Sequence, residues 1–157
     1  MKQNHLIALA GVSLGLSLAA SAAPAQVVDK PALTSVAAKA IGEACEALAV
    51  KNGWHLGIAV IGVDGNLLYF HRMDGATNIG ADTAEIKARN AFYSRRPTQD
   101  MNTLNPTFIA IKGLMPSMGG LPIKVGDNVV GSVGVGGGVG PQDSICGQAG
   151  IDAVMPK

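Results

Sequence analysis

Hydrophobic residues recur every three or four positions in three stretches of the chain, which is the spacing of one buried helix face. The first stretch covers residues 29–51 and ends before Gly53, a residue that tolerates the left-handed conformation past a helix C-terminus. The second covers 81–97, with Asp82 as the expected N-cap, and the third begins at Pro141. The sequence therefore predicts three helices.

Shorter apolar runs between these stretches are typical of strands. Residues 55–63 are apolar on both faces, so we expect a central strand covered on both sides. A second strand follows the hairpin signal Asp64-Gly65, residues 121–137 form a further hairpin, and a short strand is expected at 108–111. This order predicts an α+β domain, a mainly antiparallel sheet with helices packed on it.

The stretch GSVGVGGGVGPQD, residues 131–143, is rich in glycine but does not fit a nucleotide-binding loop. The third glycine of the dinucleotide fingerprint is missing, and no lysine follows as in a P-loop. As a strand, the stretch places Val133 and Val135 on one face and Gly134 and Gly136 on the other. Such a bare face accommodates either the backbone of a neighbouring helix or a flat ligand, and the sequence leaves both open.

The helix expected at 81–97 is the candidate neighbour, because three alanines share one side of it. Lys87 and Arg95 lie on the same side. Buried unpaired charges are costly, so these two cations must reach solvent, pair with carboxylates or bind an anionic ligand.

The first residues of the chain differ from the rest. Lys2 precedes an uncharged run at 6–20, and small residues follow, which is the pattern of a secretory signal cleaved after Ala22 or Ala25. The run is too short to span a bilayer. We therefore expect residues 1–25 to be a signal peptide and residues 26–157 to be one periplasmic or extracellular domain, without a membrane span after cleavage.

The exported part is formally neutral, with eleven basic and eleven acidic residues once Lys2 is excluded. It has no basic run, so nucleic acid is not an expected partner. Two cysteines, Cys45 and Cys146, lie on the apolar sides of two expected helices. A disulfide and a pair of buried thiols fit these positions equally well.

Motifs for catalysis or metal binding are sparse. No zinc-binding, haem-attachment or serine-nucleophile motif occurs. The exported part has two histidines, His55 and His71, and His71 on the second strand is either an ordinary strand residue or an axial ligand. Met115 and Met118 precede a glycine pair and are candidates for lining an apolar pocket.

Three stretches of the chain together resemble the haem-degrading-domain family typified by GlcG and HbpS. They are VDGNLLYFHRMDGA at 63–76, KARNAFYSRRPT at 87–98 and GGLPIKVGDNVVGSVGVGG at 119–137. The resemblance implies a profilin-like domain with a five-stranded sheet flanked by helices, usually assembled into oligomers. In exported members it implies binding of haem or iron, and in some of them haem degradation.

The resemblance also implies functional positions. Arg72, Asp74, Lys87 and Arg96 match the family pattern, as do the glycine stretches. Some secreted relatives carry a histidine soon after the DGA element, where this chain has TNIGAD at 77–82. His71, Met115 and Met118 are then the remaining candidates for a haem ligand.

We therefore expect an exported haem- or tetrapyrrole-binding protein that forms homo-oligomers. The candidate ligand-binding residues are His71, Arg72, Lys87, Arg95, Arg96, Met118, Gly134 and Gly136, with His71 as the iron ligand, and the candidate catalytic residues are Asp74 and Lys87. One alternative is an enzyme for a small carboxylate, in which Lys87 and Arg95 hold the anion while Asp74 or His71 moves a proton. Another is an oligomeric scaffold without a ligand.

Overall fold

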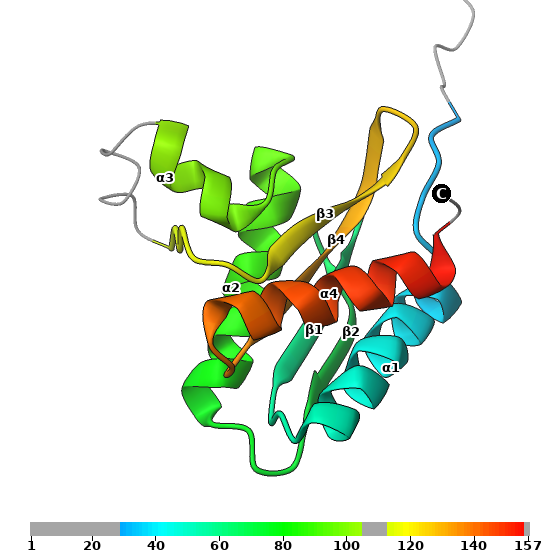
Figure 1. The fold of residues 1–157 in the computed structure, drawn as a ribbon. Helices are drawn as coiled ribbons and strands as arrows, with labels where there is room; N and C mark the ends of the chain where they lie inside the picture. Colours follow the sequence, from blue (N-terminus) through cyan, green and yellow to red (C-terminus); the bar gives the residue numbers. More distant parts are fainter. Residues whose placement is uncertain (1–28, 105–112, 156–157) are drawn as a thin grey trace, which may run out of the picture.

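The computed structural model of the chain describes residues 29–104 and 113–155 and has helices on both faces of a four-stranded sheet (Figure 1). The elements are, in chain order, α1 (Ser35–Asn52), β1 (Gly57–Gly62), β2 (Leu67–Arg72), α2 (Asn78–Ser94), the 3-10 turn η1 (Thr98–Asp100), α3 (Met101–Leu104), β3 (Gly120–Val125), β4 (Asn128–Gly136) and α4 (Gly140–Val154). This is the α+β class that the hydrophobic pattern predicted.

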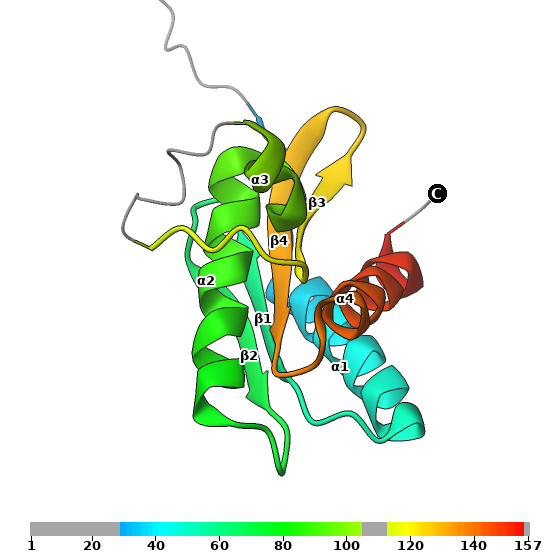
Figure 2. The same cartoon turned by 60° about the vertical axis from the view of Figure 1, so that its left-hand side comes forward.

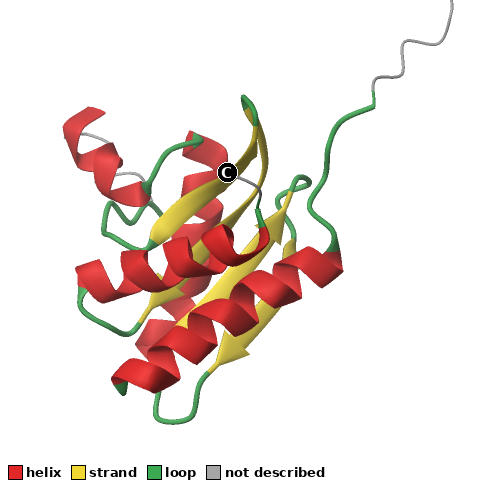
Figure 3. Cartoon of the chain, turned by 45° about the vertical axis from the view of Figure 1, so that its right-hand side comes forward, coloured by secondary structure: helices red, strands yellow, loops and turns green. Residues whose placement is uncertain are grey.

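The sheet forms the middle of three layers. The long helix α2 lies across one face, and α1 and α4 lie beside each other on the other face (Figures 2 and 3). The strand order is β2-β1-β4-β3, and each neighbouring pair is antiparallel. The strand β1 is therefore central, as predicted from its apolar composition, while β2 and β3 form the edges.

The two faces of β1 belong to different parts of the core, because strand side chains alternate. Ile58 and Val60 are fully buried in the large core shared with α1 and α4. Ala59 and Ile61 pack against the alanines of α2. The residues under α2 are mostly small, which lets this helix lie close to the sheet.

The helices begin and end at local capping signals, one of which differs from the prediction made from the sequence. Gly53 ends α1 in the left-handed conformation, with φ +67°, as expected. The N-cap of α2 is Thr77, whose hydroxyl accepts a hydrogen bond from the N–H of Gly80 at 3.1 Å. The prediction that Asp82 caps this helix is therefore wrong, because Asp82 lies in its second turn.

The sheet has four strands in the part of the chain that the structure describes. The further strand expected at 108–111 lies outside the described residues, so the five-stranded, profilin-like form stays a prediction. Within residues 29–104 and 113–155, no helix combines the length and the apolar character needed to cross a membrane.

Cys45 of α1 and Cys146 of α4 form a disulfide, with their Cα atoms 4.7 Å apart. Both residues are fully buried where the two helices pack together. Of the two alternatives that the sequence left open, the structure has the bridge. It joins residues 101 positions apart and ties the first helix to the last.

Candidate functional site

The glycine face of β4 is covered by the protein's own helix. A Cβ atom at Gly134 would overlap the carbonyl oxygen of Ala84 and the amide of Ala88, and a Cβ at Gly136 would press on the same helix, α2. Ser132, on the same face, donates a hydrogen bond to the carbonyl of Ala88 at 2.7 Å. The expectation that a flat ligand lies against Gly134 and Gly136 is therefore wrong, because α2 packs directly on the strand backbone.

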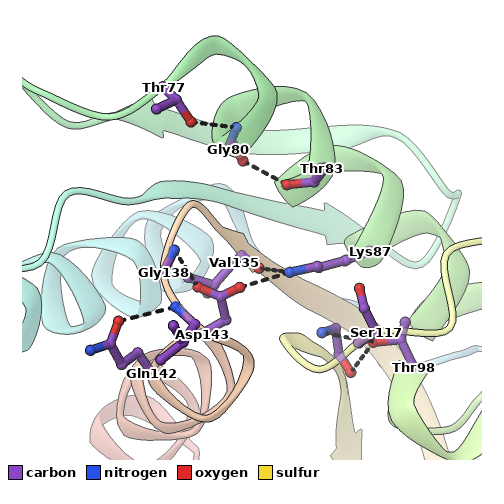
Figure 4. Close-up of polar contacts among 12 residues, drawn as sticks. Thr77, Gly80, Thr83, Lys87, Thr98, Ser117, Val135, Gly138, Gln142 and Asp143 are labelled. Atoms are coloured by element: carbon purple, nitrogen blue, oxygen red, sulfur yellow. Dashed lines mark hydrogen bonds and ion pairs between the residues drawn. The ribbon is translucent and has the colours of Figure 1, made fainter.

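Lys87 is buried at this helix–sheet interface and forms an ion pair with Asp143 (Figure 4). Its Nζ donates to Oδ2 of Asp143 at 2.7 Å and to the carbonyl of Val135 at 2.9 Å. The other carboxylate oxygen, Oδ1, accepts the N–H of Gly138 at 3.0 Å. Of the three fates expected for this cation, the structure has the pairing with a carboxylate. Asp143 was not among the residues predicted from the sequence, because no local signal links it to Lys87.

Burial raises the pKa of Asp143 above its ordinary value of 3.8, while the hydrogen bond and the charge of Lys87 act in the opposite direction. The carboxylate also lies in the first turn of α4, where the helix dipole favours negative charge. The pair borders a cavity of about 290 Å³ that Met115 and Ser117 also line. Because the ammonium group of Lys87 already has a carboxylate partner, the described residues that line this cavity offer no free cation to an anionic ligand.

A second cavity, of about 380 Å³, contains both histidines of the described residues. We call it the histidine cavity, and its lining residues are Glu46, Val50, Gly53, Trp54, His55, His71, Met73 and Asp74. His71 comes from β2, and its Nε2 lies 3.3 Å from Oε1 of Glu46 on α1. Both of these side chains are partly exposed.

His55 lies just before β1, and its Nδ1 is 2.7 Å from the carbonyl oxygen of Asp74. The two residues are 19 positions apart and meet because β1 pairs with β2. His55 was not among the ligands predicted from the sequence. The only signal for it was that histidines are rare in this chain.

The predicted arginines lie outside the histidine cavity. The Nε of Arg72 donates to the carbonyl of Ala76 at 3.0 Å, so this side chain fixes the turn after β2. Arg95 is exposed at the end of α2 in the left-handed conformation, with φ +57°. It lines a third cavity, of about 470 Å³, together with Lys30.

The other predicted residues are also separate from His71. Arg96 is exposed after α2, and Met118 lies against Gly140 at the start of α4. No residue of the described part of the chain lines more than one of the three cavities. The structure brings together His71 and Asp74 and places Lys87 and Arg95 at different cavities, so the predicted pair of cations around one anion is not formed.

The histidine cavity offers two imidazole groups as possible metal ligands. Among residues 29–104 and 113–155, no group of three His, Cys, Asp or Glu side chains is placed to hold a metal ion. Haem needs less from the protein, because the porphyrin supplies four nitrogen ligands and the chain only an axial one.

Proteins of known sequence match most of this chain. Residues 33–152 match the family model described as "Haem degrading protein HbpS-like". Protein GlcG of Escherichia coli (strain K12) is 36% identical over 110 residues, which cover 68% of this chain and 82% of GlcG.

Solved structures share the fold as well. A double mutant of Streptomyces reticuli HbpS has a TM-score of 0.79 at 30% identity, covering 87% of this chain and 96% of that chain. The structure of a PduOC:heme complex has a TM-score of 0.73 at 18% identity, covering 80% of this chain and 96% of that chain, and is similar in fold alone. By its sequence match and its fold, the chain belongs to the GlcG/HbpS-like family.

Proposed function

We propose that this protein binds haem, or a related tetrapyrrole, in the histidine cavity. The observation that carries the proposal is an imidazole group beside apolar side chains in an open cavity of about 380 Å³. The description of the family supports it, as does the haem complex of PduOC, a relative in fold.

The residues of the histidine cavity fit a porphyrin. Trp54, Val50 and Met73 offer apolar surface to the macrocycle, and imidazole is a common ligand of iron. Val50 is 66% exposed, so the rim of the cavity is open and the propionates of haem can stay in water. Bound haem would supply a redox-active iron at this place.

Titration of hemin into the protein without residues 1–25 tests the proposal. We expect a saturable shift of the Soret band. Val50→Glu should weaken hemin binding by about tenfold, because it replaces apolar contact surface with a charge. The control is Val36→Glu, on the same helix and also exposed but outside the cavity, which should leave binding unchanged.

Two results would overturn this proposal. The absence of a saturable Soret shift in the unmodified protein would remove haem binding altogether. Equal weakening by Val50→Glu and Val36→Glu would remove the histidine cavity as its location.

Membership of the family extends the proposal to haem degradation, in which haem is the substrate. Hemin-loaded protein supplied with an electron donor and dioxygen should lose its Soret band and release iron. A Soret band that persists under these conditions would limit the function to binding.

We also propose that residues 1–25 are a cleaved signal peptide and that residues 26–157 form one exported domain that assembles into homo-oligomers. The charged start and the apolar run at 6–20 support export. Phe70, 39% exposed on the edge strand β2, supports association. The mass of the secreted protein should correspond to a chain beginning at Ala23 or Gln26, and sedimentation should show more than one chain per particle.

The other two functions considered from the sequence have less support. An enzyme for a small carboxylate needs Lys87 and Arg95 at one anion, and these cations lie at different cavities. A scaffold without a ligand accounts for the packing of alanine against glycine. It gives no reason for the two histidines beside Trp54 in one cavity.

A further inference from the structure

We propose that His55, through its Nε2 atom, is the axial ligand of haem in the histidine cavity, and that His71 is not. This inference rests on the proposed haem-binding function. It differs from the expectation drawn from the sequence, which placed the ligand at His71.

The hydrogen bond of His55 determines which ring nitrogen is free. Its Nδ1 lies 2.7 Å from the backbone carbonyl oxygen of Asp74. A carbonyl oxygen can only accept a hydrogen bond, so Nδ1 must carry the proton. In the neutral ring, Nε2 then has a free lone pair, which is the form that binds a metal.

The backbone around Asp74 holds this carbonyl in place. The N–H of Met73 donates to the carbonyl of Leu56 at 3.0 Å, and the N–H of Ala76 donates to the carbonyl of Met73 at 3.0 Å. The side chain of Arg72 closes the same turn by its bond to Ala76. A ligand whose partner is fixed by backbone hydrogen bonds is preorganised, which favours a single ring orientation.

The ring of His55 lies over Gly75, and this contact needs glycine. A Cβ atom at Gly75 would be 2.8 Å from Nδ1 of His55 and 3.1 Å from its Cγ. The backbone of Gly75 also has φ +80°, which disfavours any other residue. The turn after β2 therefore provides both the hydrogen-bond acceptor and the space for the ring.

His71 has a different hydrogen-bond partner, which occupies its other ring nitrogen, Nε2. Its Nε2 lies 3.3 Å from a carboxylate oxygen of Glu46, which can only accept a hydrogen bond. The Nε2 atom therefore carries a proton while this pair exists, and it cannot donate a lone pair to iron. Ligation through this nitrogen would require both loss of the proton and separation from Glu46. A neutral ring keeps a lone pair on Nδ1, but this nitrogen lies next to the Cβ atom of its own side chain, where the haem plane is more crowded than at Nε2.

Spectra of hemin-loaded variants test the assignment. His55→Ala should weaken hemin binding by about tenfold or more and remove the imidazole–iron signature from the absorption and electron paramagnetic resonance spectra, and added imidazole should restore it. His71→Ala should keep the signature. Binding of iron-free protoporphyrin IX should be nearly equal in both variants, because it needs no axial ligand.

A second pair of variants tests the support of the ring without changing a histidine. Gly75→Ala should shift the spectrum of bound hemin toward that of His55→Ala, because the new methyl group displaces the ring. Gly126→Ala is the control: it has a similar left-handed backbone, φ +56°, and no atom within 4 Å of its Cβ position. It should leave the spectrum unchanged.

The outcomes separate the two proposals. If the unmodified protein binds neither hemin nor protoporphyrin IX, the proposed function fails and this inference with it. If hemin binds and the imidazole signature survives in His55→Ala but disappears in His71→Ala, haem binding stands and the assignment of His55 is wrong. Survival in both variants also overturns the assignment.

Discussion

At the scale of single residues, Lys87 shows how a cation that resembles a ligand-binding group can have a structural role. Helical spacing correctly places it on the side of α2 that faces the glycine strand. Its partner, Asp143, is 56 positions further along the chain, and only the packing of α4 beside the sheet brings it near. The ion pair therefore joins α2 to the start of α4.

We expect Lys87→Met to lower the free energy of unfolding by about 3–5 kcal/mol, because it leaves a buried carboxylate without its counter-charge. Lys39→Met is the matched control. The Nζ atom of Lys39 lies 3.5 Å from Oε1 of Glu43 in an exposed ion pair. Losing that pair should cost about 0.5 kcal/mol or less. Urea denaturation measures both values, and equal effects would contradict a structural role for Lys87.

The effect of Lys87→Met should also depend on pH. A carboxyl group whose pKa is raised on folding holds its proton more tightly in the folded state. Its contribution to stability is therefore greatest below the ordinary value of 3.8 and is lost as the pH rises through the folded pKa. Without Lys87 the pKa of Asp143 rises further. Lys87→Met should therefore lower the free energy of unfolding less near pH 4 than near pH 7. An equal loss of stability at both pH values would contradict this prediction.

At the scale of elements, the contact between α2 and β4 decides where a ligand can bind. The sequence predicted a face of glycines and a face of alanines, and it left open whether the two faces meet. In the structure they do, because the glycine backbone lets α2 approach closely. The start of α2 was predicted too late, because Asp82 is as good a capping residue as Thr77 and only tertiary packing selects between them.

Gly134→Ala should destabilise the fold by about 1–3 kcal/mol or more, because its methyl group has no space beneath α2. Gly147→Ala provides the contrast within α4. A Cβ at Gly147 would lie 3.3 Å from Val133, a contact that a small shift relieves, and alanine favours the helix. Thermal unfolding should separate the two variants, and a Gly134→Ala protein as stable as the wild type would show that α2 does not pack on β4 as described.

At the scale of the whole molecule, the disulfide between α1 and α4 joins two helices from opposite ends of the chain. Both helices cover the same face of the sheet (Figure 1). The bridge therefore links the two helices of this layer to each other and also closes a long loop of the chain. An oxidising compartment, as proposed for an exported protein, is the environment in which such a bridge persists.

Replacing both Cys45 and Cys146 with alanine should lower the free energy of unfolding by about 2–5 kcal/mol, because a long loop is no longer closed in the unfolded chain. A reductant should lower the melting temperature of the wild type towards that of the double variant. The same reductant should not affect the double variant. A melting temperature that is unchanged by the reductant in the wild type would show that the bridge adds no stability.

The sequence by itself determined the class of fold, the central place of β1, both hairpins and the last helix. These depend on local periodicity and turn chemistry, which a single chain carries within windows of ten to twenty residues. The family motifs could also be recognised from the sequence, because each of them lies in one contiguous stretch.

Only the tertiary structure decided which polar groups meet. It paired Lys87 with Asp143, covered Gly134 with α2, and left Val36 of α1 and Ile145 of α4 79% and 53% exposed. It also placed His55 and His71 in one cavity with different hydrogen-bond partners. Such contacts join residues far apart in the chain, and their geometry depends on how the layers pack, which no local pattern encodes.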